Sequence, residues 1–309
     1  NVIGKIYAGI ADDMLTTTIM ATTAPKYLCP AMNTEMYNNP ITQRNLEGLR
    51  SLGYHIMDPA EGWLACGITG VGRLPEPETI VEWLESKMFS TNELEGTTIL
   101  VTAGGTQENI DPVRYIGNRS SGKMGYAIAD QAARMGAQVI LVSAPTSLPV
   151  PSGVDFVSVD SALSMQEAVE ARYNDVNVVI MAAAVSDFRA LHKAEQKIKK
   201  MESMTIELVK NPDILQGLGS KKSHQVLVGF AAETEHVIKY GQDKVARKNL
   251  DMLVANDVSK SNAGFNVDTN EGYFLYPNKE PKIMPNMKKS DLARHILKEV
   301  IELVANKQS

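Results

Sequence analysis

Hydrophobic residues recur along the chain with two periods, and their alternation predicts a mixed α/β protein. Runs rich in Val, Ile and Leu predict buried strands, whereas apolar residues three and four positions apart predict amphipathic helices. The predicted strands are 97–105, 138–145, 176–188, 225–234 and 250–258, with an edge strand at 272–277. The predicted helices are 122–137, 161–174 with Ser161 as its N-cap, 212–220, 235–249 and 289–307. Strands alternating with helices indicate a Rossmann-like, doubly wound, mostly parallel sheet with helices on both faces.

The first ninety residues have shorter elements. The pattern predicts helices at 5–22, 42–53 and 77–89, strands at 25–33 and 54–59, and a Gly- and Pro-rich loop at 62–77. A polar stretch then separates the two alternations, and we take residues 91–96 as a linker. The predicted domains are therefore residues 1–90 and residues 97–309.

Composition narrows the class of protein. The 309 residues are 44% hydrophobic and 22% charged, with a formal net charge of −5. An acidic chain lacks the broad basic surface of a nucleic-acid-binding protein, and no apolar run reaches the ~18 residues of a membrane span. The two cysteines, Cys29 and Cys66, form no disulfide framework. We expect a cytoplasmic protein with neither nucleic-acid nor membrane partners.

The segment GNRSSGKMG (117–125) nearly matches the phosphate-binding P-loop, G-x-x-x-x-G-K-[ST]. Gly117, Gly122 and Lys123 fit, but Met124 stands where a Ser or Thr hydroxyl binds magnesium. The segment GGTQENIDPVRYI also separates this loop from its strand, whereas a P-loop follows its strand directly. Both departures disfavour a P-loop.

The same segment suits a different anion site. A helix starting near Gly122 offers unpaired N–H groups and a positive dipole end, and Ser120, Ser121 and Gly122 let a phosphate approach closely. Asn118 and Arg119 add side-chain donors. A helix cap without a ligand remains an open alternative.

Other chemistry-bearing residues follow strands or form basic clusters. AAAVSDFR (182–189) has small residues, including Ala183, that admit a base or ribose, and Asp187 is a candidate metal or hydroxyl ligand. GFAAET (229–234) is a second such loop. KIKK (197–200) and the i, i+4 pair Lys244 and Lys248 supply cations. An N-cap role for Asp187 and solvated lysines remain alternatives.

These segments occur together in a specific order. They resemble the ligase half of the bifunctional phosphopantothenoylcysteine decarboxylase/phosphopantothenate–cysteine ligase of coenzyme A biosynthesis, from about residue 97 to the end. The resemblance implies ligation of 4′-phosphopantothenate to L-cysteine with CTP, through an acyl-cytidylate, with Mg²⁺ on the phosphates. The motifs that carry it are TAGGTQENIDPVRYIGNRSSGKMG, AAAVSDFR, KIKK, KNPDIL, GFAAET and ARKNLDMLVANDV.

The resemblance also implies site residues. Lys197 matches the family's essential lysine, which suits charge that develops as the acyl-cytidylate forms. Asn118 matches an asparagine implicated in the onward reaction of that intermediate. The phosphate-binding role suggested by the P-loop pattern thus passes from Lys123 to lysines elsewhere. Residues matching the nucleotide site are Asp187, Phe188, Phe230, Lys244 and Lys248.

The first ninety residues resemble the family's flavin-dependent decarboxylase half. They correspond to the C-terminal part of its flavodoxin-like domain. The matching segments are GIADDMLTT, PAMNTEMY and LACGITGVGR. The resemblance implies FMN as cofactor, Asn33 as a ligand of the substrate carboxylate, and Cys66 as the proton donor to the enethiol carbon. Cys29 is expected to be an inert buried residue.

Parts of the decarboxylase pattern are absent. The family's half begins with a strand and a glycine-rich FMN phosphate loop and contains a catalytic histidine, and no histidine precedes Asn33 here. We therefore expect an incomplete flavin domain, from a fragment or a chain without decarboxylase activity, that binds FMN poorly. The family also implies a homodimer through the ligase domain and a higher homo-oligomer in the intact parent.

Two other functions remain as alternatives. An NAD(P)-dependent reductase would use the same type of sheet, but AGGTQE replaces the expected G-x-G-x-x-G turn. Titration with NADPH against CTP separates these functions. The second alternative is that the chain is a non-catalytic flavoprotein fragment. In that case Lys197→Gln should change no measurable property except stability.

Overall fold

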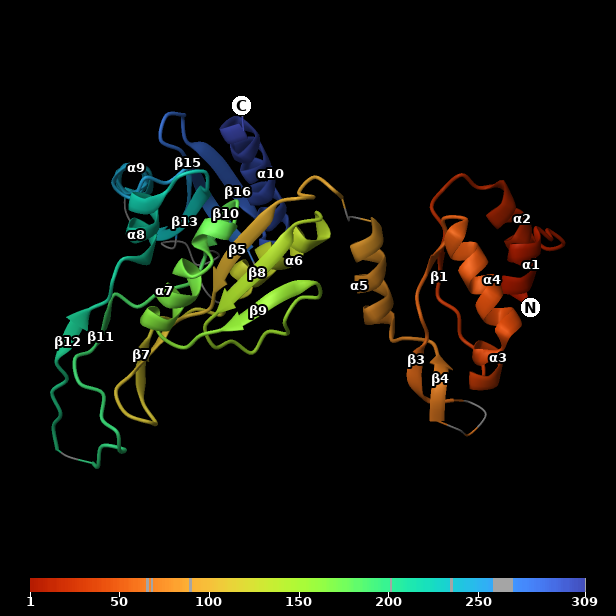
Figure 1. Ribbon diagram of the computed structural model, residues 1–309, viewed down its shortest axis with the longest axis horizontal. Helices are drawn as coiled ribbons and strands as arrows, with labels where there is room; N and C mark the ends of the chain where they lie inside the picture. The colour runs from red at the N-terminus through yellow and green to blue at the C-terminus, as the bar shows by residue number, and fades with distance from the viewer. Residues whose placement is uncertain are drawn as a thin grey trace. The chain divides into compact units, whose positions relative to one another are not determined.

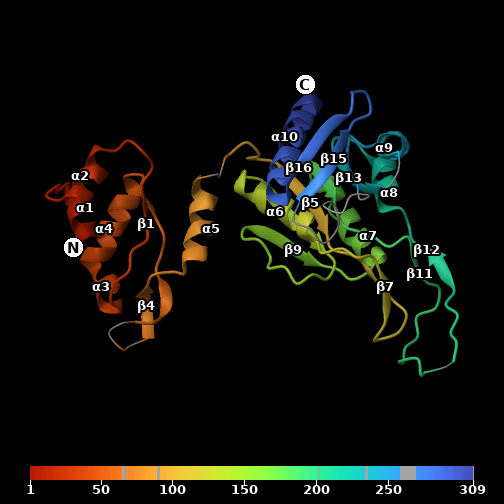
Figure 2. The same ribbon diagram turned by 180° about the vertical axis from the view of Figure 1, so that it is seen from behind.

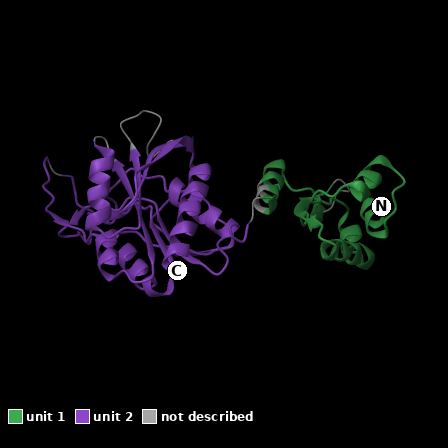
Figure 3. Ribbon diagram, turned by 90° about the horizontal axis from the view of Figure 1, so that it is seen from above, with its two compact units in different colours: residues 1–90 green, residues 91–309 purple. Residues whose placement is uncertain are grey.

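The structure, a computed structural model, divides the chain into two units, Asn1–Ser90 and Thr91–Ser309 (Figure 3). Residues 91–96 belong to the second unit, where Leu94 is buried in the core. The described residues are 1–64, 67, 69–88, 91–200, 202–233, 236–257 and 269–308.

An eight-stranded sheet organises the second unit. Its order is β16-β15-β14-β13-β10-β5-β8-β9, and the six strands from β14 to β9 are parallel. In chain order these six run 3-2-1-4-5-6, the doubly wound arrangement, which confirms the predicted fold class. The parallel strands are β5 (Thr98–Ala103), β8 (Gln138–Ser143), β9 (Val154–Ser158), β10 (Val178–Met181), β13 (Val226–Glu233) and β14 (Met252–Asp257). The antiparallel strands are β15 (Thr269–Leu275) and β16 (Lys282–Lys288).

Helices cover both faces of this sheet, because alternate residues of each central strand point to opposite sides. Ile99 and Val101 pack in the core under α6 (Lys123–Arg134) and α10 (Lys289–Gln308). Leu100, between them, belongs to the core under α7, α8 and α9. These last helices span Ala162–Glu170, Ile214–Lys221 and Val237–Arg247 (Figures 1 and 2). The central strands β10, which is fully buried, and β5, which is buried except at Thr98, are therefore mostly apolar.

Two short ribbons extend beyond the carboxyl ends of the central strands (Figure 1). One pairs β6 (Gln107–Asn109) with β7 (Tyr115–Gly117), and the other pairs β11 (Phe188–Ala190) with β12 (Leu208–Lys210). Three-residue strands are too short to show a hydrophobic period, so the sequence predicted none of them.

The first unit contains five helices and two small sheets among its described residues. Strand β1 pairs with β2 in parallel, and β3 pairs with β4 in an antiparallel hairpin. The helices are α1 (Val2–Ala8), α2 (Met14–Ala21), α3 (Thr34–Asn38), α4 (Pro40–Ser51) and α5 (Pro77–Met88). The strands are β1 (Tyr27–Leu28), β2 (His55–Ile56), β3 (Ala60–Trp63) and β4 (Thr69–Arg73). No described helix in either unit has the length and apolar character of a bilayer span.

Three sequence predictions for these elements were wrong. The helix predicted at 5–22 is two helices, because Asp13 caps a new one, accepting a hydrogen bond from Thr16 N–H at 2.8 Å. The loop predicted at 62–77 contains the β3–β4 hairpin. Its glycines serve packing, since a Cβ on Gly72 would lie 2.1 Å from the Met32 carbonyl oxygen. The sequence predicted β15 as an edge strand, but β15 pairs with β16, which forms the edge of the sheet instead.

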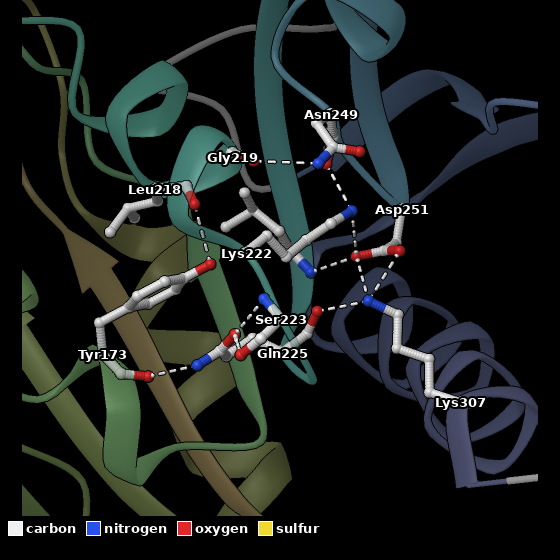
Figure 4. A network of polar contacts seen from close by, with 10 residues as sticks. Tyr173, Leu218, Gly219, Lys222, Ser223, Gln225, Asn249, Asp251 and Lys307 are labelled. Atoms are coloured by element: carbon white, nitrogen blue, oxygen red, sulfur yellow. Dashed lines mark hydrogen bonds and ion pairs between the residues drawn. The ribbon is translucent and has the colours of Figure 1, made fainter.

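A polar network closes the sheet at the amino ends of β13 and β14 (Figure 4). The Asp251 carboxylate accepts hydrogen bonds from Leu227 N–H at 2.7 Å, Lys222 Nζ at 3.2 Å and Lys307 Nζ at 3.1 Å. The Lys222 side chain is 10% exposed and burial lowers its pKa, although Asp251 opposes the shift. Gln225 extends the network to the Tyr173 carbonyl in the 3₁₀ turn Tyr173–Asp175. The network therefore joins α8, the two strands and the last turn of α10.

We predict that Asp251→Ala lowers the free energy of unfolding of the second unit by about 3–5 kcal/mol, because two partly buried ammonium groups lose their carboxylate. Urea unfolding followed by far-ultraviolet circular dichroism measures the loss. Glu170→Ala is the control, since its partner Lys221 is 61% exposed, and it should cost less than about 1 kcal/mol. Equal costs for both variants would contradict the prediction. Tryptophan fluorescence reports only the first unit, which contains Trp63 and Trp83.

Candidate functional site

A cavity of about 350 Å³ lies at the carboxyl ends of the parallel strands, where β5 and β10 lie side by side. The helices that follow these strands cover opposite faces of the sheet, so the loops diverge and leave a crevice. The cavity is lined by Asn118, Ser120, Ser121, Gly122, Lys123, Met124, Gly125, Ala182, Ala183, Ala184, Val185, Asp187, Phe230, Ala231, Ala232, Lys244, Asn256, Asn270 and Lys289.

The start of α6 forms one wall. Gly122 is its N-cap at φ 76°, and a Cβ there would lie 2.7 Å from the Thr146 side chain, so only glycine fits. Ser120 Oγ accepts the Gly122 N–H at 3.4 Å. The first turn of α6 thus presents N–H groups and the positive end of its dipole to the cavity.

Backbone contacts join the loops after β5 and β10. Ala184 N–H donates to the Gly104 carbonyl at 2.8 Å, and Gly105 forms a parallel bridge with Ala184. The Asn118 amide donates to the carbonyls of Ala184 at 3.4 Å and Val185 at 3.2 Å. Asn118 is therefore held at the crossover although its side chain is exposed.

The described lining is strongly basic. Lys123 and Lys289 come from α6 and α10 on one face of the sheet, and Lys244 comes from α9 on the other. Asp187, which is exposed, is the only acidic residue of this lining. The arrangement suits a ligand with several negative charges.

The structure brings together eight of the residues that the sequence predicted and leaves three outside the lining. Lys248 Nζ instead forms an ion pair with Asp213 Oδ2 at 2.8 Å. Burial alone would raise the pKa of Asp213, but the hydrogen bond from Lys248 helps to lower it below its usual value. Phe188 is 49% exposed at the start of β11. Lys197 is exposed on the loop between β11 and β12. The eight lining residues are Asn118, Ser120, Ser121, Gly122, Ala183, Asp187, Phe230 and Lys244, and their roles remain predictions.

A buried carboxylate tethers the loop that carries Lys197. Asp111 accepts hydrogen bonds from the N–H groups of Val113 and Arg114 at 2.8 Å and of Ile198 at 3.2 Å. Arg114 also donates to the Ile198 carbonyl at 2.8 Å. Burial opposes ionisation of Asp111, but these donors hold its pKa below the usual value. The tether is thus intact at neutral pH and is lost only as the pH falls through that lowered pKa.

Sequence reasoning missed three polar residues of the lining, Asn256, Asn270 and Lys289. Asn256 is the second-last residue of β14, and its position near the carboxyl end of a parallel strand was a usable signal. Asn270 and Lys289 lie on β15 and at the start of α10, so they reach the cavity only because β15 and β16 reverse direction. Lys123, set aside in favour of other lysines, also lines the cavity.

Metal ligands are sparse among the described residues. No group of three or more His, Cys, Asp or Glu side chains converges there. Asp187 therefore offers a single carboxylate, and a magnesium ion here would depend on oxygens of the nucleotide phosphates.

The first unit has its own cavity of about 610 Å³, between α1, α4 and the segment after β1. Cys29 directly follows β1 and lines this cavity, and burial raises the pKa of its thiol. Asn33 caps α3, accepting the Glu35 N–H at 2.8 Å, and is not among the lining residues. Cys66 lies outside the described residues.

Comparison with known proteins assigns both units to families. Residues 94–304 match the family described as "DNA/pantothenate metabolism flavoprotein C-terminal domain", and residues 1–89 match the family "Flavoprotein". The chain is 48% identical over 307 residues to the coenzyme A biosynthesis bifunctional protein CoaBC of Bacillus subtilis, covering 98% of this chain and 76% of the relative. The chain belongs to the CoaBC family. The resemblance seen in the sequence motifs is thereby confirmed at the level of the family.

Two further members of the CoaBC family show the same relation. The Escherichia coli (strain K12) protein is 45% identical over 306 residues, covering 97% of this chain and 75% of the relative. The crystal structure of the C-terminal domain of a CoaBC protein superposes with a TM-score of 0.61 at 43% identity, over 70% of this chain and all of that one. The doubly wound unit therefore has a solved counterpart within the family.

We predict that Asp111→Asn loosens the Lys197 loop, because a neutral amide holds three N–H donors less strongly and offers one oxygen fewer. Hydrogen exchange of residues 191–200 should become faster, while exchange in β5 and β8 stays unchanged. Asp155→Asn is the control, since Asp155 is exposed on β9. Unchanged exchange in the loop, or equal acceleration throughout the sheet, would contradict the role assigned to Asp111.

Proposed function

We propose that the second unit is a ligase that joins 4′-phosphopantothenate to L-cysteine at the expense of CTP. The observation that carries this proposal is the cavity at the β5–β10 crossover, with cationic side chains from both faces of the sheet and a helix N-terminus between them. Membership of the CoaBC family supports the same conclusion. In this proposal, residues 97–309 form the ligase domain.

The reaction has two steps. The carboxylate of phosphopantothenate attacks the α-phosphorus of CTP, which forms an acyl-cytidylate and releases pyrophosphate. The cysteine amine then attacks the acyl carbon, loses a proton and expels CMP. Both steps depend on positioning and on neutralising phosphate charge, for which Lys244, Lys123 and the α6 N-terminus are suited. Asn118, fixed at the crossover, is assigned to the acyl intermediate.

Lys197 lies outside the cavity of its own chain. Its role therefore requires either movement of the 191–207 loop or insertion into the cavity of a second copy. Apolar side chains on the two ribbons and the adjoining loops support a homodimer, because their exposure has a cost in a monomer. They are Val113, Tyr115, Phe188, Leu191 and Leu208, from 43% to 60% exposed.

We predict that the protein releases pyrophosphate when supplied with phosphopantothenate, cysteine, Mg²⁺ and CTP, and more slowly with ATP. Lys197→Gln should abolish this release, because the charge that develops at the α-phosphate loses its partner, while circular dichroism shows an intact fold. Lys193→Gln removes a charge from the same exposed loop and should retain activity. No release by the wild-type protein with any nucleotide would overturn the proposed function.

A mixing experiment separates the two ways in which Lys197 reaches the cavity. Lys197→Gln and Asn118→Ala proteins should each be inactive alone. If Lys197 acts in a second copy, mixed dimers contain one site with both native residues, and activity returns on mixing. If the loop closes over its own cavity, every site stays defective and mixing restores nothing.

For the first unit we propose a flavin site in which the ring supplies most of the binding. The cavity lining is largely apolar, with Asn1, Thr42 and Asn45 as its polar members, and it includes no Lys or Arg side chain among the described residues. Such a cavity suits the isoalloxazine ring better than a phosphate. Cys29 and Met32 would lie against the ring.

We predict that this unit binds FMN weakly and binds riboflavin with a dissociation constant within about threefold of that for FMN, a difference under about 1 kcal/mol. Fluorescence titration of each flavin gives the two constants. Binding of FMN that is ten or more times tighter than that of riboflavin would show a strong phosphate contact and contradict the prediction.

A further inference from the structure

Two buried amide oxygens in the crossover cavity have no hydrogen-bond partner among the residues that the structure describes. They are Oδ1 of Asn256 and Oδ1 of Asn270, and both residues line the cavity. Asn270 is 3% exposed, and its Nδ2 makes a 3.9 Å contact with the Met124 sulfur. A buried acceptor without a donor costs free energy, because it has lost its hydrogen bonds to water. Two such atoms in one cavity indicate a ligand that supplies the missing donors.

The sheet register places the two asparagines on one face. Asn256 of β14 lies opposite Gly272 of β15, and Asn270 precedes Gly272 by two residues. Alternate residues of a strand point to the same side, so Asn256 and Asn270 are diagonal neighbours, and Gly272 has no side chain to separate them. This is the face covered by α6 and α10, since Val254 and Phe274 of the same rows belong to the core beneath those helices. One small group can therefore reach both oxygens.

The charge of the lining distinguishes between possible donors. A metal cation also satisfies amide oxygens, but Lys123, Lys244 and Lys289 line the same cavity, and Asp187 is the only acidic residue of the described lining. Basic surroundings disfavour a bound cation and favour a neutral N–H or O–H donor. A hydroxyl or a secondary amide has one hydrogen to donate, whereas a primary amine donates two from one nitrogen. The paired acceptors therefore fit a neutral amine best.

A nearby anion site distinguishes an amino acid from a nucleobase. Met124, which contacts Asn270, is the second residue of α6, so the unpaired N–H groups of the first turn lie close to the asparagines. These N–H groups suit a carboxylate. An α-amino acid has a primary amine beside a carboxylate, whereas the amino group of a base has no anion next to it. The donors and acceptors of this end of the cavity thus match an α-amino acid.

We propose that Asn256 and Asn270 form the subsite for the amino-acid substrate, L-cysteine. Their Oδ1 atoms accept the two hydrogens of its neutral amine, which leaves the nitrogen lone pair free to attack the acyl carbon of the intermediate assigned to Asn118. The C–N bond forms as the bond from that carbon to the phosphate oxygen of CMP breaks, CMP keeps the electron pair, and the surplus proton passes to water. The carboxylate of cysteine lies against the first turn of α6, which pyrophosphate has left by then. This inference rests on the proposed ligase function.

Two separate assays test the subsite with Asn270→Leu and Asn256→Leu, which replace each amide by an apolar side chain of similar size. Exchange of labelled pyrophosphate into CTP needs phosphopantothenate but no cysteine, so its rate should change less than about twofold. The KM for cysteine should rise roughly three- to tenfold in each variant, the usual effect of losing one hydrogen bond to a neutral donor, while the KM values for CTP and phosphopantothenate stay the same. Asn278→Leu is the matched control, since Asn278 is exposed between β15 and β16, and it should leave every constant unchanged.

Thermal stability provides a measurement that a purely structural role would reverse. Removing a buried oxygen without a partner should leave the melting temperature of the second unit in Asn270→Leu equal to or above that of wild type. In an active ligase, a lower melting temperature with equal losses in both assays, an effect confined to CTP or phosphopantothenate, or an unchanged KM for cysteine would overturn the subsite alone. Wild-type protein that exchanges no pyrophosphate and forms no product would overturn the ligase function, and the subsite with it.

Discussion

The parallel pairing of β5 with β10 is the constraint on which the second unit depends. The two strands are adjacent in the sheet although the chain between them forms β8, β9 and the helices beside them. Because successive crossovers are right-handed, the helices after β5 and β10 must cover opposite faces. The loops then diverge, and the hydrogen bond from the Ala184 N–H to the Gly104 carbonyl limits the distance between them. The cavity, the α6 N-terminus and the position of Asn118 all follow from that separation.

The two edges of this sheet differ in how their buried polar groups are satisfied. At the amino edge, Asp251 pairs with Lys222 and Lys307, so the protein neutralises its own cations. At the carboxyl edge, Asn270 lines the cavity and has an oxygen without a hydrogen-bond partner among the described residues. Functional sites commonly retain such locally unfavourable groups, which a ligand then satisfies. The contrast agrees with a structural role for the first edge and supports the proposed binding role of the second.

The sequence was sufficient for the parts of the molecule that local patterns determine. The β5 and β10 strands, α6 and the Ser161 cap of α7 follow from hydrophobic period and capping chemistry, and the loops after the strands follow from the doubly wound order. Long-range pairing was not predictable in this way. The β3–β4 hairpin looks like a loop because its glycines accommodate the backbone near Met32. Asn270 and Lys289 enter the site through antiparallel additions to the sheet, and the tether between Asp111 and Ile198 spans 87 residues.

The covering of one face of the sheet by α10 also affects how the second unit folds during synthesis. Leu292, Ile296 and Val300 complete the core that also contains residues of β5, β10 and β13. Until the ribosome has released this segment, α6 alone covers that face, and the part under α10 stays open to water or to chaperones. The doubly wound core can form early, but α10 is needed to complete its burial, so folding of this unit must conclude after α10 has been translated.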